Sequence, residues 1–380
     1  MSLEIEHNGN DIADWEPTNF LQKYIMGDIV CLNRWLENKP FILNFGNWIF
    51  RAIGAPIFLN NPISGLLILI GMLIATPWVA ANAMIGLLVA VIVALALKLD
   101  RSSIASGGLT FHGMLVGLAL ASSFNKQQHY AWVIIPVIVL SAISVYVASG
   151  LGTLCARVGL PAFNLPFNLV TFVFMAACGV NNHHFPLSDV SVSSNDTFRN
   201  SLPLSWGQIF LGLPNSLAQI YGSASPVAGG LILLAMLVAS PIILVHSVLG
   251  SFVAIFIALS VAAPPVQIAQ GVWGFNAVLS CASLGGVFLV INVHSSILAF
   301  ISAIFSTLIF GALGTVLAPA RLPALAFPFN ISASILLSVS SSRVYRIPLN
   351  RVRYPELHFV LHKRNKVGHV ADDRQNGADA

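Results

Sequence analysis

The sequence predicts an all-α, polytopic membrane protein, because it carries too little charge for a soluble chain and because its apolar segments approach the length of membrane-spanning helices. Of its 380 residues, 56% are hydrophobic and only 8% are charged, whereas soluble chains carry about 25% charged residues. The same composition excludes a disordered chain. An internal duplication, described below, arranges the apolar segments in two equivalent sets.

The charged residues lie mainly at the two ends of the chain. Residues 1–39 contain 3 Lys or Arg and 7 Asp or Glu, residues 343–380 contain 8 and 4, and the 303 residues between them contain only ten. Two polar tails therefore flank one apolar body. The basic C-terminal tail is typical of a cytoplasmic segment beside anionic membrane lipids. No nucleic-acid-binding module accompanies it, so we expect no nucleic-acid partner.

Ten apolar segments approach the roughly 20 residues that a spanning helix needs. They lie near residues 63–81, 83–99, 109–124, 131–152, 161–179, 227–245, 247–263, 273–291, 294–316 and 323–341. The N-terminus lacks a basic segment followed by an apolar run, so we expect no cleavable signal peptide. Two shorter apolar stretches, near 41–58 and 206–222, each end before a proline-containing turn. Such interrupted segments in matching places predict re-entrant helices.

The body of the chain is an internal duplication. Residues 62–77 align with residues 226–241 at an offset of 164, with nine of sixteen positions identical, including both terminal prolines and a glycine. Residues 160–168 align with residues 322–330 at an offset of 162, with six of nine identical, and both read Leu-Pro-x-x-x-x-Pro-Phe-Asn. Apolar composition alone does not place these prolines in register.

The duplication predicts how the chain is organised in the membrane. Five crossings per copy is an odd number, so the second copy is expected to be inverted relative to the first, with the pore at the interface between them. The expected parts are a cytoplasmic N-terminal tail (1–39), a first membrane repeat (40–179), an extracellular loop (180–205), a second membrane repeat (206–342) and a basic cytoplasmic C-terminal tail (343–380). The loop contains the glycosylation sequon at Asn195.

The body offers little acid–base chemistry. No Asp or Glu falls within an expected span, whereas ion-coupled transporters commonly place a carboxylate at the coupling site. This favours a passive pore and disfavours an enzyme. The four cysteines show no metal-binding spacing, so we expect neither a metal nor a cofactor. The titratable groups expected deep in the spans are His112, His246 and His294, each interpreted first as a hydrogen-bonded structural group.

The remaining signals are aromatic rings and broken helices. Two prolines within six residues interrupt a helix and free backbone carbonyls, which must then be satisfied within the protein or by a solute. The equivalent residues Phe111 and Phe275 follow glycine-containing turns. Phenyl faces and a row of carbonyl oxygens together suit a small, flat, uncharged solute rich in N–H donors, such as urea.

At these motifs the sequence resembles the urea transporter family. The resemblance covers roughly residues 40–355 and includes Asn60-Asn-Pro-Ile-Ser-Gly65, Trp273-Gly-Phe-Asn276 and both Leu-Pro elements. It implies facilitated urea permeation without ion coupling, a homotrimer with one pore per subunit, and a plasma-membrane location among membrane lipids. The pore residues that it implies are Phe58, Phe111, His112, Asn164, Gln219, Phe275, Asn276, Ala326 and Ala55.

Several of these positions depart from the family pattern. The signature threonine in the middle of the pore is replaced by Asn164 in the first copy and by Ala326 in the second. The family has a Gln or Glu at the start of each row of carbonyl oxygens along the pore, called the oxygen ladder. Gln219 is this residue in the second half, but its counterpart in the first half is Ala55. An acceptor removed from a dehydrated site leaves a solute N–H unsatisfied, at a cost of about 1–3 kcal/mol. We therefore expect altered rate or selectivity.

Two further departures concern the aromatic slots. In the family, an Asn follows the aromatic residue that forms the wall of each flat slot in the pore. That Asn is Asn276, after Phe275, in the second half, but its place after Phe111 is taken by His112. The position equivalent to the further slot aromatic, Phe58, is Gly222. His112 leaves open a channel for another small neutral solute, such as ammonia, water or a urea analogue. A second alternative is a non-conducting relative that acts as a membrane scaffold.

Overall fold

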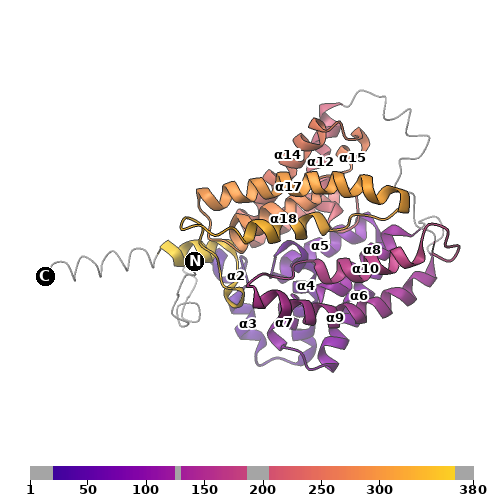
Figure 1. Cartoon of the computed structure of the whole chain (residues 1–380). Helices are drawn as coiled ribbons and strands as arrows, with labels where there is room; N and C mark the ends of the chain where they lie inside the picture. The colour runs from indigo at the N-terminus through magenta and orange to yellow at the C-terminus, as the bar shows by residue number, and fades with distance from the viewer. Residues whose placement is uncertain (1–19, 125–129, 186–204, 364–380) are drawn as a thin grey trace, which may run out of the picture.

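The computed structural model describes residues 20–124, 130–185 and 205–363, and these residues fold almost entirely into helices (Figure 1). Within the described ranges, extended pairing is limited to one antiparallel bridge between Leu289 and Arg346. The all-α, polytopic fold class expected from composition is confirmed, and the chain is a multi-pass membrane protein.

The helices of the body recur in the same order in the two halves. The first half contains α4 (Phe41–Gly54), α5 (Pro62–Ala75), α6 (Pro77–Ala96), α7 (Arg101–Ala105), α8 (Phe111–Ser123), α9 (Ile134–Arg157) and α10 (Leu165–Cys178). The second contains α12 (Trp206–Gln219), α13 (Pro226–Ala239), α14 (Pro241–Ser260), α15 (Pro265–Ala269), α16 (Phe275–Ala282), α17 (Val293–Leu317) and α18 (Phe327–Leu337). Helices α5 to α8 have counterparts 164 residues later, and α10 has one 162 residues later.

Fewer helices than expected are long enough to span a membrane alone. Among the described residues, four are: Pro77–Ala96, Ala131–Arg157, Pro241–Ser260 and Val293–Ala320. The segments Phe41–Ile57 and Pro62–Ala75 form a further candidate bent by 76° at the break, and five other apolar helices have 10–17 residues. The helices differ from the expected ranges in both directions: α6 and α9 are longer than 83–99 and 131–152, whereas α10 and α18 are shorter than 161–179 and 323–341.

Prolines and glycines explain the shorter helices. The expected span 63–81 is divided, because α5 ends at Ala75 and Pro77 opens α6; a proline ring is tolerated in the first turn of a helix but not in its interior. The expected span 273–291 is interrupted after Ala282 by residues 283–287, where Gly286 has a positive φ of 136°.

Glycines allow the helices of each half to pack closely. A Cβ atom on Gly65 of α5 would overlap the carbonyl of Phe50 in α4, and one on Gly229 of α13 would overlap the carbonyl of Pro214 in α12. The two glycines are equivalent in the duplication. Each short helix α4 or α12 is thus held against the helix that follows it by a backbone-to-backbone crossing.

Helices α5 and α13 join the two halves. The hydroxyl of Ser64 in α5 donates to the carbonyl of Ala235 in α13 (2.7 Å), while Gly71, seven residues later in α5, packs on Ala228, seven residues earlier in α13. The two equivalent helices therefore run in opposite directions where they touch. Figure 1 shows the first-half helices, coloured indigo to magenta, gathered beside the orange second-half helices.

Candidate functional site

Among the described residues, two large cavities in the body share one lining residue. The first cavity has a volume of about 600 Å³ and the second about 460 Å³, within the range of small-molecule sites. The first is lined by residues that include Ala55, Phe58, Ser106, Phe111, His112, Phe163, Asn164 and Phe288. The second is lined by residues that include Gln219, Gly222, Gln270, Phe275, Phe310, Leu325, Ala326 and again Asn164.

Equivalent positions of the duplication line the two cavities. Ala55, Phe58, Ser106 and Phe111 in the first correspond, at an offset of 164, to Gln219, Gly222, Gln270 and Phe275 in the second. Residues 161–164 correspond to residues 323–326 at an offset of 162. Because Asn164 lines both cavities, the site is one pair of symmetry-related chambers that approach each other at the Leu-Pro elements.

Each chamber begins where a short helix stops. Helix α4 ends at Gly54 and α12 ends at Gln219, and both are followed by a left-handed residue, Phe58 with φ of 64° and Gly222 with φ of 71°. The last carbonyls of a helix have no partner within it. Here the turns bond two of them: the N–H of Phe58 donates to the Ala55 carbonyl and that of Gly222 to the Gln219 carbonyl, both at 3.0 Å, which leaves one lone pair of each oxygen for a solute. The side chain of Gln219 donates to the carbonyl of Gln270 (3.0 Å).

Aromatic rings form one side of the first cavity. Phe58 packs edge-to-face on Phe288 (centroids 5.8 Å apart) and on Phe329 (6.2 Å), and Phe163 packs on the same two rings at 5.2 and 4.9 Å. We call these four residues the phenylalanine cluster. Its contacts hold Phe58 and Phe163 in fixed orientations beside the cavity.

The second cavity has a different aromatic wall. Phe275 packs edge-to-face on Phe310 (5.9 Å), and Phe310 also packs on Trp273 (5.4 Å). The position equivalent to Phe310 in the first half is Ala148, which lines the first cavity. The two chambers are thus equivalent in backbone but differ in their side chains.

His112 contributes a polar group to the first cavity. Its side chain is 3% exposed, its ring lies 4.0 Å from that of Phe111, and its Nδ1 atom has no hydrogen-bond partner among the described residues. The counterpart Asn276 does not line either cavity. Its Oδ1 accepts from the N–H of Phe329 and its Nδ2 donates to the carbonyl of Leu325, both at 3.1 Å.

The other expected histidines have structural surroundings. His246 in α14 is buried and its Nδ1 lies 2.9 Å from the carbonyl of Ile242. The expectation that His294 is deep in a span is wrong: it is exposed in the first turn of α17, beside Arg343. Asn195, the expected glycosylation site, falls outside the described residues.

Asp100 is the acidic side chain on the wall of the first cavity, and it is solvent-exposed beyond the end of α6. Its carboxylate accepts hydrogen bonds from the Ser102 hydroxyl (2.5 Å) and from the N–H and hydroxyl of Ser103 (both 2.8 Å). These bonds lower the pKa of Asp100 to about 2. The carboxylate is therefore ionised throughout the physiological pH range.

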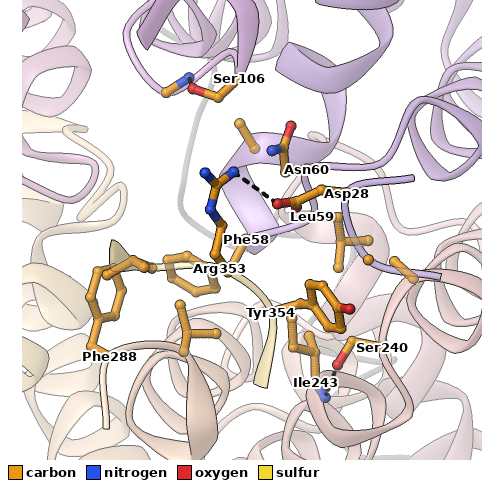
Figure 2. A pocket seen from close by; sticks show the side chains of 16 residues that line it. Asp28, Phe58, Leu59, Asn60, Ser106, Ser240, Ile243, Phe288, Arg353 and Tyr354 are labelled. Atoms are coloured by element: carbon orange, nitrogen blue, oxygen red, sulfur yellow. Dashed lines mark hydrogen bonds and ion pairs between the residues drawn. The ribbon is translucent and has the colours of Figure 1, made fainter. Parts of the chain in front are cut away.

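A smaller cavity of about 180 Å³ adjoins the first one, with which it shares Ala55, Phe58, Ser106, Gly108 and Phe288. Figure 2 shows Arg353, from the C-terminal segment, reaching Asp28, from the N-terminal segment, above these rings. The Arg353 and Asp28 side chains are 3.1 Å apart. Both ends of the described chain thus meet beside the first cavity.

Two asparagines that were not selected from the sequence lie at the centre of the site. Asn168 and Asn330 are the last residues of the two Leu-Pro-x-x-x-x-Pro-Phe-Asn elements, and each bonds to a backbone N–H of the opposite element. Their repetition in the sequence was a usable signal. Phe288 and Phe310 gave no such signal, because neither belongs to a repeated motif.

Comparison with known proteins gives one consistent family. Residues 46–341 match the model of the family described as "UT: Urea transporter". The chain is 34% identical over 363 residues to "Urea transporter 1" of Capra hircus, covering 93% of this chain and 94% of the relative. It is 35% identical to the protein of the same name from Mus musculus (90% of each chain) and 36% identical to that from Rattus norvegicus (90% of each chain).

Proposed function

Because the chain belongs to the urea transporter family, we propose that it passes urea down its concentration gradient through a pore formed by the two cavities, without ion coupling. The family is one of transporters, so the chain is a transporter and not an enzyme. The observation that carries the proposed route is the pair of equivalent chambers that both reach Asn164.

The chemistry of the chambers suits urea. Phe111 and Phe275 offer phenyl faces to polarised N–H groups, and the ends of α4 and α12 offer carbonyl oxygens that replace water around amide donors. In the first chamber, His112 and Asn164 add polar atoms where Ala55 supplies none. We assign solute contact in the second chamber to Gln219, Phe275 and the backbone at Ala326, and in the first to Phe58.

Passive permeation is supported by the charges at the site. Among the described residues, no Asp or Glu lines the second cavity, and Asp100 at the mouth of the first stays ionised because its pKa is lowered to about 2. A group that does not titrate near neutral pH cannot carry a proton with the solute. We therefore expect no proton coupling through a carboxylate at this site.

We further propose an organisation for the whole chain. The antiparallel contact between α5 and α13 supports an inverted relation between repeat 40–179 and repeat 206–342, with α4 and α12 as re-entrant pore helices. Both tails, 1–39 and 343–380, then lie on the cytoplasmic side and loop 180–205 on the extracellular side of the plasma membrane. A glycosylated homotrimer with one pore per subunit completes the proposal.

Stopped-flow shrinkage of liposomes containing the purified protein tests this function. We expect saturable urea flux that is unchanged by imposed proton or sodium gradients, with thiourea, acetamide and methylammonium as comparison solutes. Flux driven by either gradient would contradict the uncoupled mechanism, and the absence of urea flux would contradict the permeant.

One observation favours ammonia as a second permeant. His112 lines the first cavity with a buried nitrogen that no described residue bonds. His112→Asn restores the residue type of the equivalent position, Asn276. If ammonia uses this site, the substitution lowers ammonia flux and leaves urea flux in place; equal loss of both would contradict a separate role.

A further inference from the structure

We infer that Asn168 and Asn330 are positioning residues for permeation, each holding from the opposite half the backbone turn at the middle of the pore. This inference rests on the proposed function, because it takes the passage past Asn164 and Ala326 as the route of the solute. Neither asparagine lines a cavity, so each acts through the residue that it holds.

The two asparagines make a crossed pair of hydrogen bonds. Oδ1 of Asn330 accepts the N–H of Asn164, and Oδ1 of Asn168 accepts the N–H of Ala326, both at 3.0 Å. Asn168 is 0% exposed and Asn330 is 5% exposed. Each asparagine belongs to the first turn of its own helix, α10 or α18, and bonds the residue that begins the other helix.

The turns that they hold are strained and need support. Phe163 and Leu325, directly before the two bonded residues, are non-glycine residues with φ of 46°. A left-handed conformation costs about 1–2 kcal/mol for such a residue and persists only where the surroundings impose it. An unbonded N–H at the start of a helix within a membrane adds a further cost. The crossed bonds remove that cost at both turns.

The support is unequal in the two halves. In the second half, Nδ2 of Asn330 also donates to the carbonyl of Ala326 (2.7 Å), and Asn276 braces Leu325 and Phe329. In the first half, Nδ2 of Asn168 has no partner among the described residues. His112, which stands where Asn276 would be, makes no equivalent brace, so Asn330 is the principal support for the turn at Asn164.

This inequality gives an ordered expectation for variants. Removing the Asn330 side chain frees the N–H of Asn164, which lines both cavities, and also removes a bond to the Ala326 carbonyl. Removing the Asn168 side chain frees only the N–H of Ala326, while Asn330 still bonds the Ala326 carbonyl and Asn276 still bonds the neighbouring Leu325 carbonyl. Asn330→Leu should therefore lower urea permeability by about tenfold, and it should also lower the ratio of urea to thiourea permeability. Asn168→Leu should change both quantities less.

The conservative and control variants separate positioning from general stability. Asn330→Gln keeps an amide oxygen for the Asn164 N–H and an amide donor for the Ala326 carbonyl, and it should retain more of the urea-to-thiourea ratio than Asn330→Leu. Thr171→Val, a near-isosteric change at a buried α10 hydroxyl that no described residue bonds, should leave the ratio unchanged. The inference is overturned if folded Asn330→Leu keeps the wild-type ratio, or if Thr171→Val changes the ratio as much.

Residue-resolved hydrogen exchange of the wild-type protein in lipid nanodiscs provides a test that does not depend on any variant folding. The N–H groups of Asn164 and Ala326 should exchange slowly although both residues line cavities, and fast exchange of both would overturn the inference. Wild-type liposomes without urea flux would instead refute the proposed function, while slow exchange would still support the crossed bonds.

Discussion

Phe58 keeps an aromatic ring on the first cavity at the cost of a left-handed backbone. Its φ of 64° costs a non-glycine residue about 1–2 kcal/mol, and the equivalent residue, Gly222, adopts nearly the same φ without that cost. The contacts of Phe58 with Phe288 and Phe329 hold the ring in place. We therefore propose that the ring, which a glycine could not supply, limits the width of this cavity.

Replacing Phe58 should widen the first chamber. In Phe58→Gly the backbone strain is relieved and one aromatic wall is lost, so flux of bulkier urea analogues such as thiourea and dimethylurea should rise relative to urea. Liposome shrinkage with each solute measures these ratios. Phe58→Leu, which keeps a bulky side chain, is the control, and unchanged ratios in Phe58→Gly would show that the ring does not limit passage.

Asn164 and Ala326 offer a second test at the residue scale. Introducing threonine at both positions adds a hydroxyl on each side of the point where the cavities meet, and an added acceptor for a dehydrated N–H is worth about 1–3 kcal/mol. The double variant Asn164→Thr, Ala326→Thr should therefore shift urea flux and its preference over thiourea and acetamide. Values equal to those of the wild type would contradict the view that this junction selects the solute.

Among the elements, the α4–α5 and α12–α13 pairs show most directly how backbone packing positions a chamber. The chambers begin at the ends of α4 and α12, and each of these helices is held by a glycine of the next helix, Gly65 or Gly229. Because the contacting group is a backbone carbonyl, no side-chain rotation can make room for a methyl group. The ends of α4 and α12 are therefore placed by these crossings.

A matched pair of glycines in α13 tests this point. Gly229→Ala should push α13 away from the Pro214 carbonyl and destabilise the protein by about 2–4 kcal/mol. Gly230 has no atom within 4 Å of an added Cβ, so Gly230→Ala should be neutral or stabilising by up to about 1 kcal/mol. Thermal unfolding in detergent compares them, and equal unfolding temperatures would contradict the close crossing.

On the scale of the whole molecule, the N-terminal and C-terminal segments of the described chain meet beside the first cavity. Besides the ion pair between Arg353 and Asp28, the buried Arg51 of α4 donates to the carbonyl of Asp28 (2.9 Å). The C-terminal segment is bonded to the π-helical break at residues 283–287 through His358, whose Nδ1 lies 3.1 Å from the carbonyl of Gly286. Its Nε2 accepts the N–H of Arg353 (2.9 Å).

These contacts make docking of residues 343–363 dependent on pH. Burial lowers the pKa of His358, so the undocked segment, with a histidine pKa of about 6.5, binds more protons than the docked one. The stabilising contribution is therefore complete above about pH 6.5 and is lost as the pH falls below it. Protonation of His358 also puts a hydrogen on Nε2, so this atom can no longer accept the N–H of Arg353.

Hydrogen exchange of residues 343–363 at about pH 7.5 and pH 5.5, corrected for intrinsic rates, measures the docking. Protection should decrease at the lower pH in the wild type and should depend less on pH in His358→Gln, which cannot gain a proton in this range. Asp28 and Arg353 are the charged groups that face His358. Equal protection at both pH values in the wild type would contradict the expectation.

The sequence by itself showed that this is a membrane protein and that its body is an internal duplication. It also identified most of the residues discussed at the two cavities. Scarcity of charge and apolar length are properties of the chain alone, and a repeated motif such as Leu-Pro-x-x-x-x-Pro-Phe-Asn marks equivalent positions without any knowledge of contacts. Ala55, Phe111, Asn164 and Gln219 were found in this way, from repetition and family resemblance. Their assigned roles in permeation remain proposals.

The tertiary structure alone decided which groups meet. Some expected spans, such as 63–81 and 273–291, ran past the end of a helix because apolar composition continues across prolines and glycines that end it. Asn276, expected at the pore, bonds Phe329 and Leu325 instead, whereas Asn168 and Asn330 meet the opposite element across about 160 residues of chain. A hydrogen bond between distant segments depends on how the two halves pack, and no local pattern of residue types encodes that packing.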